Sequence, residues 1–262
     1  MKIIDLREEH TSSYFKCLED WSDEMDDAGD RKAMWFEKMS GRGLRVKLAV
    51  DDGGNPGGMI QYLPVEHSFI DGRDCYFINC IWVHGYTQGR GNFQGNGMGG
   101  ALLEAAEADA RTMGACGIAA WGLSLPFWMK ASWFKKHGYK KADREGMRML
   151  VWKPFVTHAV PPRWIRKKKG PLPCPGKVVV TALVNGWCPA MNMTFERAKR
   201  AAREYGDCVE FIEIDTTDRS VFLEWGIADG IFIDGKQLRF GPPLSYEKIK
   251  KLIGKRVDRL TS

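Results

Sequence analysis

Short apolar runs bounded by turn residues alternate with longer amphipathic stretches, a pattern that predicts a protein of the α/β class. Leu44 to Val50 and Gly58 to Leu63 are strand-like runs joined by a connector rich in Asp, Gly and Asn, which predicts an antiparallel hairpin. A longer strand is expected from Cys75 to Val83. An alanine-rich helix should follow over 101–113, and a further strand over 117–123.

The stretch 154–176 breaks this pattern, because it is rich in proline and basic residues and reads as an extended connector. We therefore expect a first domain at 1–153, a linker at 154–176 and a second domain at 177–262. In the second domain the pattern predicts, in order, a buried strand at 177–185, a helix around 196–204, a strand at 209–215, a short helix at 219–225, a hairpin at 231–238 and a closing helix at 246–257.

Composition fits two globular domains, since 262 residues with 44% hydrophobic content can bury two cores. The net charge of +6 comes from the linker region, so a nucleic-acid partner is not expected. The sequence shows neither an apolar run long enough to span a membrane nor a signal peptide, which favours a cytoplasmic location. In the cytoplasm the seven cysteines are expected to be reduced thiols. The Cys and His spacings predict no metal site.

The most informative stretch is the glycine-dense loop that leads into the helix at 101–113. Glycines remove Cβ atoms and let the backbone approach a ligand, while the first turn of a helix offers unpaired N–H groups and a positive dipole end. The loop therefore predicts an anion site, and specifically a phosphate site. Gly95, Gly97 and Gly100 also fit a dinucleotide-binding pattern, but no acidic residue follows at the required place, and the Lys-Ser/Thr of a P-loop is missing.

Gln94-Gly95-Asn96-Gly97-Met98-Gly99 resembles the Gln/Arg-x-x-Gly-x-Gly/Ala motif of the GNAT-type acyl-CoA N-acyltransferases. The strand at 75–83 and the segment 131–139 resemble two further blocks of that family, although Gln88-Gly-Arg-Gly91 intervenes as a near-duplicate of the motif. The resemblance implies a mixed central sheet with two splayed strands and flanking helices, and acetyl-CoA as co-substrate without a metal. It implies a binding site for the coenzyme at Ile81, Trp82, Val83, Gln94, Gly95, Asn96, Gly97, Met98, Gly99 and Gly100.

Catalytic residues transfer less directly from the family. The tyrosine that usually protonates the leaving thiolate is Phe134 here, and a frequent asparagine is Trp128. Glu66, or a water ordered by Asn79, is the candidate base, and Ser132 is a remote candidate acid. His84 and His137 are more typical of surface or loop histidines than of proton carriers.

The second domain resembles a thioredoxin-like domain, and the two together resemble the YoaP-type acetyltransferases. Cys188 precedes the first helix of that domain, where its thiolate would be favoured, but Met191 replaces the second redox cysteine and no proline occurs in Ile227–Gly230. We include Cys188 as a candidate reactive residue, although a scaffold without chemistry is the commoner meaning of these losses.

The implied activity is direct transfer of an acetyl group to an amine of a small molecule or a protein. An acidic run, Glu19, Asp20, Asp23, Glu24, Asp26, Asp27 and Asp30, could attract a cationic acceptor, although such runs are more often a solvated helical face. Two alternatives stay open: a non-catalytic sensor of acyl-CoA, and a thiol-linked activity at Cys188.

Overall fold

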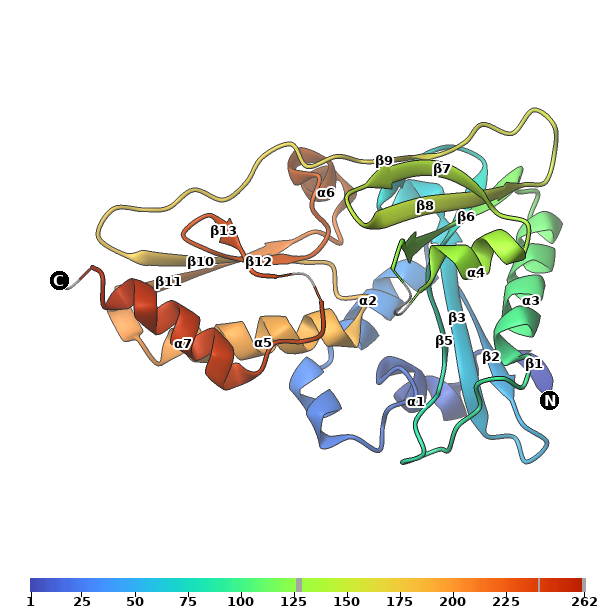
Figure 1. The fold of residues 1–262 in the computed structure, drawn as a ribbon, viewed down its shortest axis with the longest axis horizontal. Helices are drawn as coiled ribbons and strands as arrows, with labels where there is room; N and C mark the ends of the chain where they lie inside the picture. The colour runs from blue at the N-terminus through green and yellow to red at the C-terminus, as the bar shows by residue number, and fades with distance from the viewer. Residues whose placement is uncertain (126–128, 240, 261–262) are drawn as a thin grey trace. The chain divides into compact units, whose positions relative to one another are not determined.

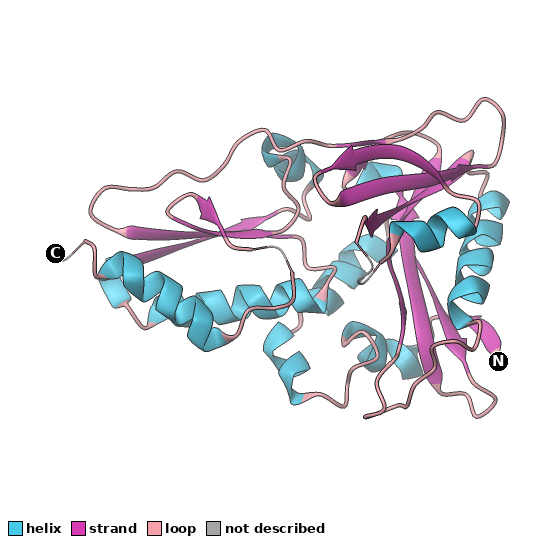
Figure 2. Ribbon diagram, in the orientation of Figure 1, coloured by secondary structure: helices cyan, strands magenta, loops and turns pink. Residues whose placement is uncertain are grey.

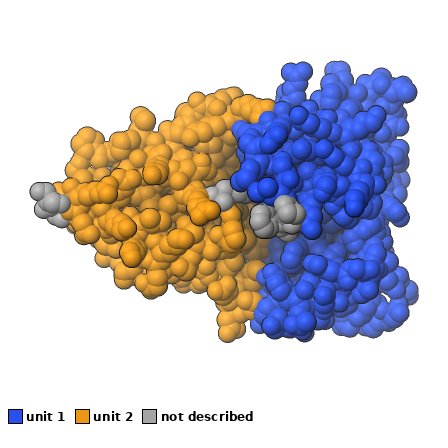
Figure 3. Space-filling view, viewed as in Figure 1, with its two compact units in different colours: residues 1–21, 37–165 blue, residues 22–36, 166–262 orange. Residues whose placement is uncertain are grey.

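The computed structural model describes residues 1–125, 129–239 and 241–260, and the chain divides into two compact units. The first unit contains Met1–Trp21 and Glu37–Ile165, and the second contains Ser22–Phe36 and Arg166–Ser262 (Figure 3). Ser22–Phe36 lies within the predicted first domain, 1–153, but packs in the second unit.

The first unit is built on a mixed sheet of seven strands, in which one neighbouring pair is parallel and the others are antiparallel. In spatial order the strands are β1 (Lys2–Asp5), β2 (Arg45–Val50), β3 (Pro56–Pro64), β5 (Cys75–Val83), β6 (Gly117–Leu123), β8 (Arg148–Pro154) and β7 (Lys140–Glu145). β5 and β6 form the parallel pair. The predicted mixed sheet with flanking helices is confirmed (Figure 2).

Short helices and a two-stranded ribbon complete this part of the chain. They are η1 (Glu8–His10), α1 (Thr11–Phe15), α2 (Arg31–Ser40), which crosses between the units, η3 (Val65–His67), α4 (Ala131–Lys136), and the pair β4 (Ile70–Asp71) with β9 (Arg163–Trp164). The longest helix of the first unit is α3 (Met98–Thr112), which lies along the sheet beside β2 and β3 (Figure 1). Its buried side chains recur at helical spacing, at Met98, Leu102, Leu103, Ala106 and Ala110.

Two polar anchors fix α3 against the sheet. Asp109 accepts a hydrogen bond from Tyr62 on β3 and pairs with the Nε of Arg45 on β2 at 3.0 Å. On the other side, Nζ of Lys153 on β8 lies 2.6 Å from Glu107. Burial alone would raise the pKa of Asp109, but the bonds from Tyr62 and Arg45 outweigh it and lower that pKa. The start of α3 is therefore held in a defined place relative to the strands.

The second unit has a four-stranded sheet in the order β11 (Val209–Asp215), β10 (Val178–Val184), β12 (Gly230–Ile233) and β13 (Lys236–Gln237). β10 pairs parallel with β11 and antiparallel with β12. Alternate residues of β10 from Val178 to Val184 pack in one core with α5 (Pro189–Arg203) and α7 (Tyr246–Val257), while Leu183 faces a second cluster beside α6 (Arg219–Trp225). β10 is thus apolar on both faces, which explains its continuous apolar sequence.

Within this unit, η2 (Asp23–Ala28) packs on α5 through paired charges. Asp27 lies 2.9 Å from Nε of Arg197 and 2.9 Å from an amino group of Arg200. Arg31 likewise pairs with Glu196 at 2.6 Å. Part of the acidic run is therefore neutralised by α5 rather than presented to an acceptor.

The anchoring of α3 leads to a stability prediction. Asp109→Asn removes the charge that Arg45 and Tyr62 share, so the free energy of unfolding should fall by roughly 1–3 kcal/mol at pH 7. Because the folded pKa of Asp109 is lowered, the deficit should shrink as the pH falls through that pKa. Urea unfolding of full-length protein measures both effects. Glu104→Gln, an exposed change on the same helix, is the matched control, and an equal loss in both variants would refute the anchoring.

Candidate functional site

β5 and β6 are paired only along the first half of each strand. Their paired register runs from Cys75 with Gly117 to Ile78 with Ala120, whereas β5 continues to Val83 against β3 and β6 continues to Leu123 against β8. The freed edge of β6 is met at Leu123 by a bridge to Lys130. Beyond Ile78, β5 therefore has no paired strand on that side among the described residues.

A bulge and an indole mark the point where the strands separate. Asn79 is skipped in the pairing of β3 with β5, because Gln61 pairs with Cys80 and Tyr62 with Ile78. The carbonyl oxygen of Asn79 accepts a hydrogen bond of 2.7 Å from Nε1 of Trp121 on β6. Bulges of this kind redirect side chains and end pairing next to active sites.

Seven buried side-chain polar atoms have no hydrogen-bond partner among the described residues, and two of them, Oδ1 of Asn79 and Nε1 of Trp82, lie on β5 near the parting. Buried side-chain polar atoms are nearly always paired, and exceptions call for a ligand, an ion or an ordered water. Two exceptions within four residues of one strand single out this end of β5 as a place that a ligand completes.

The glycine loop lies against the start of α3 and faces open space. Gly95 and Gly97 adopt left-handed backbone with φ of 84° and 77°, and a Cβ built on either meets no atom within 4 Å. The first helical bond is from the amide of Ala101 to the carbonyl of Gly97, and no side chain caps the helix. The amides of Met98, Gly99 and Gly100 are therefore left as donors at the positive end of a helix of 15 residues.

The residues before the loop hold it in place. The amide of Gln94 donates to Oδ1 of Asn92 at 2.9 Å, and Nε2 of Gln94 donates to the carbonyl of Val83 at 3.3 Å. The Phe93 ring packs so closely on Gly57 that a Cβ there would lie 2.5 Å from it. The predicted binding residue Gln94 thus ties the loop to the end of β5.

Helix α4 and the residue that follows it supply two side chains beside the same helix start. A Cβ on Gly99 would lie 3.4 Å from the Trp133 ring, and one on Gly100 would lie 3.8 Å from Nε2 of His137. Nδ1 of His137 is 2.9 Å from the carbonyl of Trp133, so it must carry the proton that it shares with this oxygen. The family block at 131–139 therefore packs against the glycine loop, a proximity that sequence spacing alone could not reveal.

Comparison with known proteins decides what this arrangement is. Residues 3–126 match the model of the acetyltransferase (GNAT) family. The chain contains a GNAT acetyltransferase domain. This confirms the family prediction for that part of the chain and the prediction of an acetyltransferase enzyme.

Solved structures of similar proteins include three GNAT acetyltransferases. One from Brucella melitensis in complex with acetyl-CoA is 18% identical, with 61% of this chain and 90% of that chain covered and a TM-score of 0.41. A second, from Escherichia coli in complex with CoA, is 12% identical over 62% and 88%, with a TM-score of 0.45. A third, from Staphylococcus aureus, is 14% identical over 59% and 99%, with a TM-score of 0.44. No curated protein matches the chain.

The candidate catalytic residues of the GNAT domain fall in different places. Asn79 lies where β5 and β6 separate. Glu66 is exposed in η3, which directly follows β3, and the last residue of β3 pairs with Tyr76. Tyr76 belongs to the paired half of β5, two residues before Ile78, where the pairing with β6 ends. The role of Glu66 as base stays a prediction. Phe134 is fully buried and Ser132 is exposed. Trp128 lies outside the described residues.

The two histidines both lie outside helices and strands, as their sequence contexts favoured, but His84 is not on the surface. His84 is fully buried, and each ring nitrogen has a partner: Nδ1 lies 2.7 Å from the carbonyl of Gly91, and Nε2 accepts from Nε1 of Trp21 at 2.9 Å. Since a carbonyl only accepts and an indole only donates, the proton must be on Nδ1. His84 is therefore a neutral structural link rather than a proton carrier in this arrangement.

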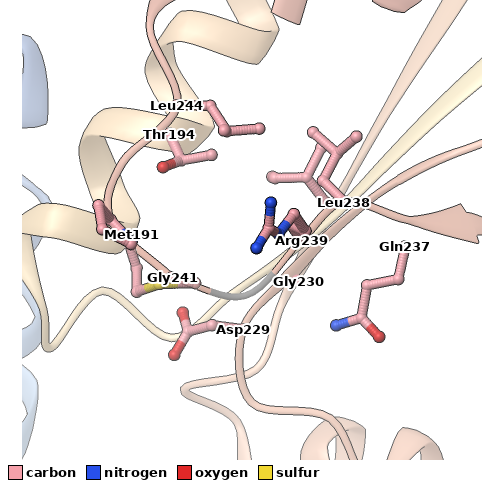
Figure 4. A pocket seen from close by; sticks show the side chains of 11 residues that line it. Met191, Thr194, Asp229, Gly230, Gln237, Leu238, Arg239, Gly241 and Leu244 are labelled. Carbon is pink, nitrogen blue, oxygen red and sulfur yellow. The ribbon is translucent and has the colours of Figure 1, made fainter. Parts of the chain in front are cut away.

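In the second unit, Cys188 is half-buried at the N-cap of α5, and Met191 lines a pocket with Asp229 and Arg239 (Figure 4). The pocket has room for about 20 Å³, which is the space of a water and not of a coenzyme. Asp229 accepts from the amide of Asn185 at 2.9 Å and from Nε1 of Trp187 at 3.0 Å. Burial raises its pKa to about 6 although both bonds oppose the shift.

Neither the sequence pattern nor the GNAT motif identified Asp229, because its environment is made by segments far apart in the chain. Cys188 keeps the position that was predicted for it, ahead of a helix. Among the described residues, no group of His, Cys, Asp or Glu is arranged to hold a metal ion, and no helix combines the length and apolarity of a membrane span.

Asp229 predicts a pH dependence of stability. Its folded pKa of about 6 lies above the ordinary 3.8, so the folded state binds the proton more tightly and the unfolding free energy falls as the pH rises from 4 to 6. The variant Asp229→Asn lacks this dependence. The stability of wild type relative to the variant should fall by roughly 1–3 kcal/mol between pH 4 and pH 7. Chemical unfolding of both full-length proteins at the two pH values tests this, and a difference independent of pH would show that the carboxyl is not perturbed.

Proposed function

We propose that the protein is an N-acetyltransferase that moves an acetyl group from acetyl-CoA directly to an amine. The observation that carries the proposal is the end of β5: it is parted from β6, contains two buried unpartnered polar atoms, and runs into an uncapped helix start through an open glycine loop. The unpaired edge of β5 and its unpartnered polar atoms could bind the long, partly apolar portion of a ligand. The free amides at the start of α3 could bind an anionic group at its end.

Acetyl-CoA supplies the acetyl group as a thioester, whose carbon–sulfur bond is exchanged for a carbon–nitrogen bond to the acceptor. The amides of Met98, Gly99 and Gly100 would hold the diphosphate, with Gly95, Asn96 and Gly97 letting the backbone come close. Backbone groups of Ile81, Trp82 and Val83 would bind the pantetheine arm along the freed edge of β5. A backbone N–H there would polarise the thioester carbonyl, which is the contribution that usually lowers the barrier most.

Proton transfer is assigned to water rather than to a side chain. The acceptor must lose a proton before it attacks, and Oδ1 of Asn79 is a buried acceptor able to orient a water for that purpose. The departing thiolate must gain a proton, and Phe134, at the position of the usual tyrosine, cannot provide one. We infer that solvent protonates the sulfur, so removing the Ser132 hydroxyl should cost little activity.

For the second unit we propose a thioredoxin-like domain in a YoaP-type arrangement, within the boundaries 177–262 after a linker at 154–176. The support is its mixed four-stranded sheet, with α5 following the central strand β10 and α7 closing the chain. The amine acceptor, whether a small molecule or a protein, and a cytoplasmic location remain part of the same proposal.

Mass spectrometry after incubation with acetyl-CoA and pooled amines tests the reaction. The enzyme should yield free CoA and an amine heavier by one acetyl group. A stoichiometric complex with acetyl-CoA, without any product, would instead establish the acyl-CoA sensor that the sequence left open.

Gly97→Val tests the loop. At a φ of 77° a β-branched side chain is strained, and its methyl groups would occupy the open space in front of the helix start. The affinity for CoA, measured by calorimetry, should fall at least about tenfold, since one lost or obstructed amide contact is worth about 1.4 kcal/mol or more.

Gly114→Val is the matched control for Gly97→Val. Gly114 follows the other end of the same helix, has a φ of 80° and also has open space around its Cβ position. It should suffer the same strain but bind CoA like wild type. If Gly97→Val also binds CoA like wild type, the loop does not hold the diphosphate.

A further inference from the structure

Four aromatic side chains gather where β5 ends, around Tyr86. Its ring centroid lies 6.0 Å from that of Trp21, 6.3 Å from that of Trp82 and 5.5 Å from that of His84. Tyr86 and Trp21 are 45% and 40% exposed, which is unusual for large rings and leaves part of their surfaces open. We call Trp21, Trp82 and Tyr86 the aromatic cluster.

The near-duplicate motif Gln88-Gly-Arg-Gly91 builds this cluster. The carbonyl of Gly91 orients His84, and His84 in turn accepts from the Trp21 indole. Gly89 lies so close to the Trp21 ring that a Cβ there would be 2.1 Å from it. The insertion Gln88-Gly-Arg-Gly91 therefore positions Trp21. Phosphate binding by the glycine loop does not require this role.

The charge beside the cluster is negative. Glu19 stands two residues before Trp21 in the chain and is partly buried. Burial raises the pKa of Glu19, and the charge of Glu19 in turn contributes to raising the pKa of Tyr86. The nearby cation Arg90 is already paired, because its Nη2 lies 2.6 Å from both carboxylate oxygens of Asp20. His84 is neutral in the tautomer fixed above. Glu19 thus supplies a carboxylate that Arg90 does not offset.

Trp82 of the cluster lies on the face of β5 that is turned away from α3. Val83 faces α3, since its Cγ2 is 3.8 Å from the Cβ position of Gly99. Neighbouring side chains on a strand point to opposite faces, so Trp82 faces away from α3 and from the glycine loop. Its backbone, however, belongs to the freed edge of β5. A ligand held on the cluster would therefore approach that edge from the side opposite the diphosphate.

We propose that Trp21, Trp82, Tyr86 and Glu19 form an acceptor subsite for an aliphatic diamine, with one ammonium held on the rings beside Glu19 and the second amine presented at the edge of β5. Aromatic faces with a carboxylate attract alkylammonium groups. The held group cannot be the reacting one, because that environment stabilises the protonated form, and the nitrogen that attacks must lose its proton. A diamine meets both requirements, because one nitrogen stays protonated on the rings while the other loses its proton and attacks. This proposal rests on the proposed acetyl transfer.

The test compares 1,4-diaminobutane with 1-aminobutane, which has the same chain and lacks the second charge. Wild type should acetylate the diamine with a kcat/KM at least about tenfold higher. Glu19→Gln and Tyr86→Leu should each bring the ratio of the two kcat/KM values several-fold closer to one, as expected for the loss of one charge or one ring face. Tyr86→Leu leaves the Trp21–His84 hydrogen bond in place, so a folding defect is not expected.

Asp71→Asn is the control, since it removes an exposed carboxylate at the end of β4 and should keep the wild-type ratio. Calorimetric titration of 1,4-diaminobutane into CoA-loaded protein gives a readout independent of turnover, and Glu19→Gln should weaken that binding by several-fold. Equal kcat/KM values for both amines in wild type, or unchanged ratios in both variants, would overturn the subsite. Binding that weakens in Glu19→Gln without any acetyl transfer would support the subsite and overturn the proposed reaction.

Discussion

The site depends on the separation of β5 from β6 at Ile78. Parallel neighbours in a sheet normally satisfy each other's backbone groups along their full length, so an early separation leaves polar groups that must be satisfied otherwise. Here the sheet meets that demand with an indole donor from Trp121 to the Asn79 carbonyl and a bridge from Lys130 to Leu123. Among the described residues no strand pairs with that side of β5 beyond Ile78, while on their outer sides β5 pairs with β3 as far as Val83 and β6 pairs with β8 as far as Leu123.

The second requirement is a helix whose start meets the end of the parted strand. α3 is held by charged anchors that lie on its C-terminal half, at Glu107 and Asp109, and among the described residues no side chain caps its N-terminal turn. Gln94 joins the loop to Val83, which couples the helix start to the strand end. The arrangement is preorganised, and binding should order little additional chain.

Sequence reasoning located the helix, the glycine loop and most strands, because hydrophobic period and glycine chemistry are local signals. It named Asn79 and Glu66 as candidate bases by residue type, but it could not give their places along β5, because these depend on the register with β3. The roles of Trp121, His84 and Trp21 were not foreseen, because each depends on a hydrogen bond to a residue 42 or 63 positions away.

The route of the chain has a consequence for how the protein can be divided. Ser22–Phe36 belongs to the second unit, although both its chain neighbours, Trp21 and Glu37, belong to the first. The backbone therefore enters the second unit, returns, and enters it again at Arg166. A fragment cut at the proline-rich connector would carry Met25, Ala28 and Trp35 without the α5 surface or the arginines that cover and neutralise this segment. Each unit consists of two separate stretches of the chain, so neither can be excised intact by a single break.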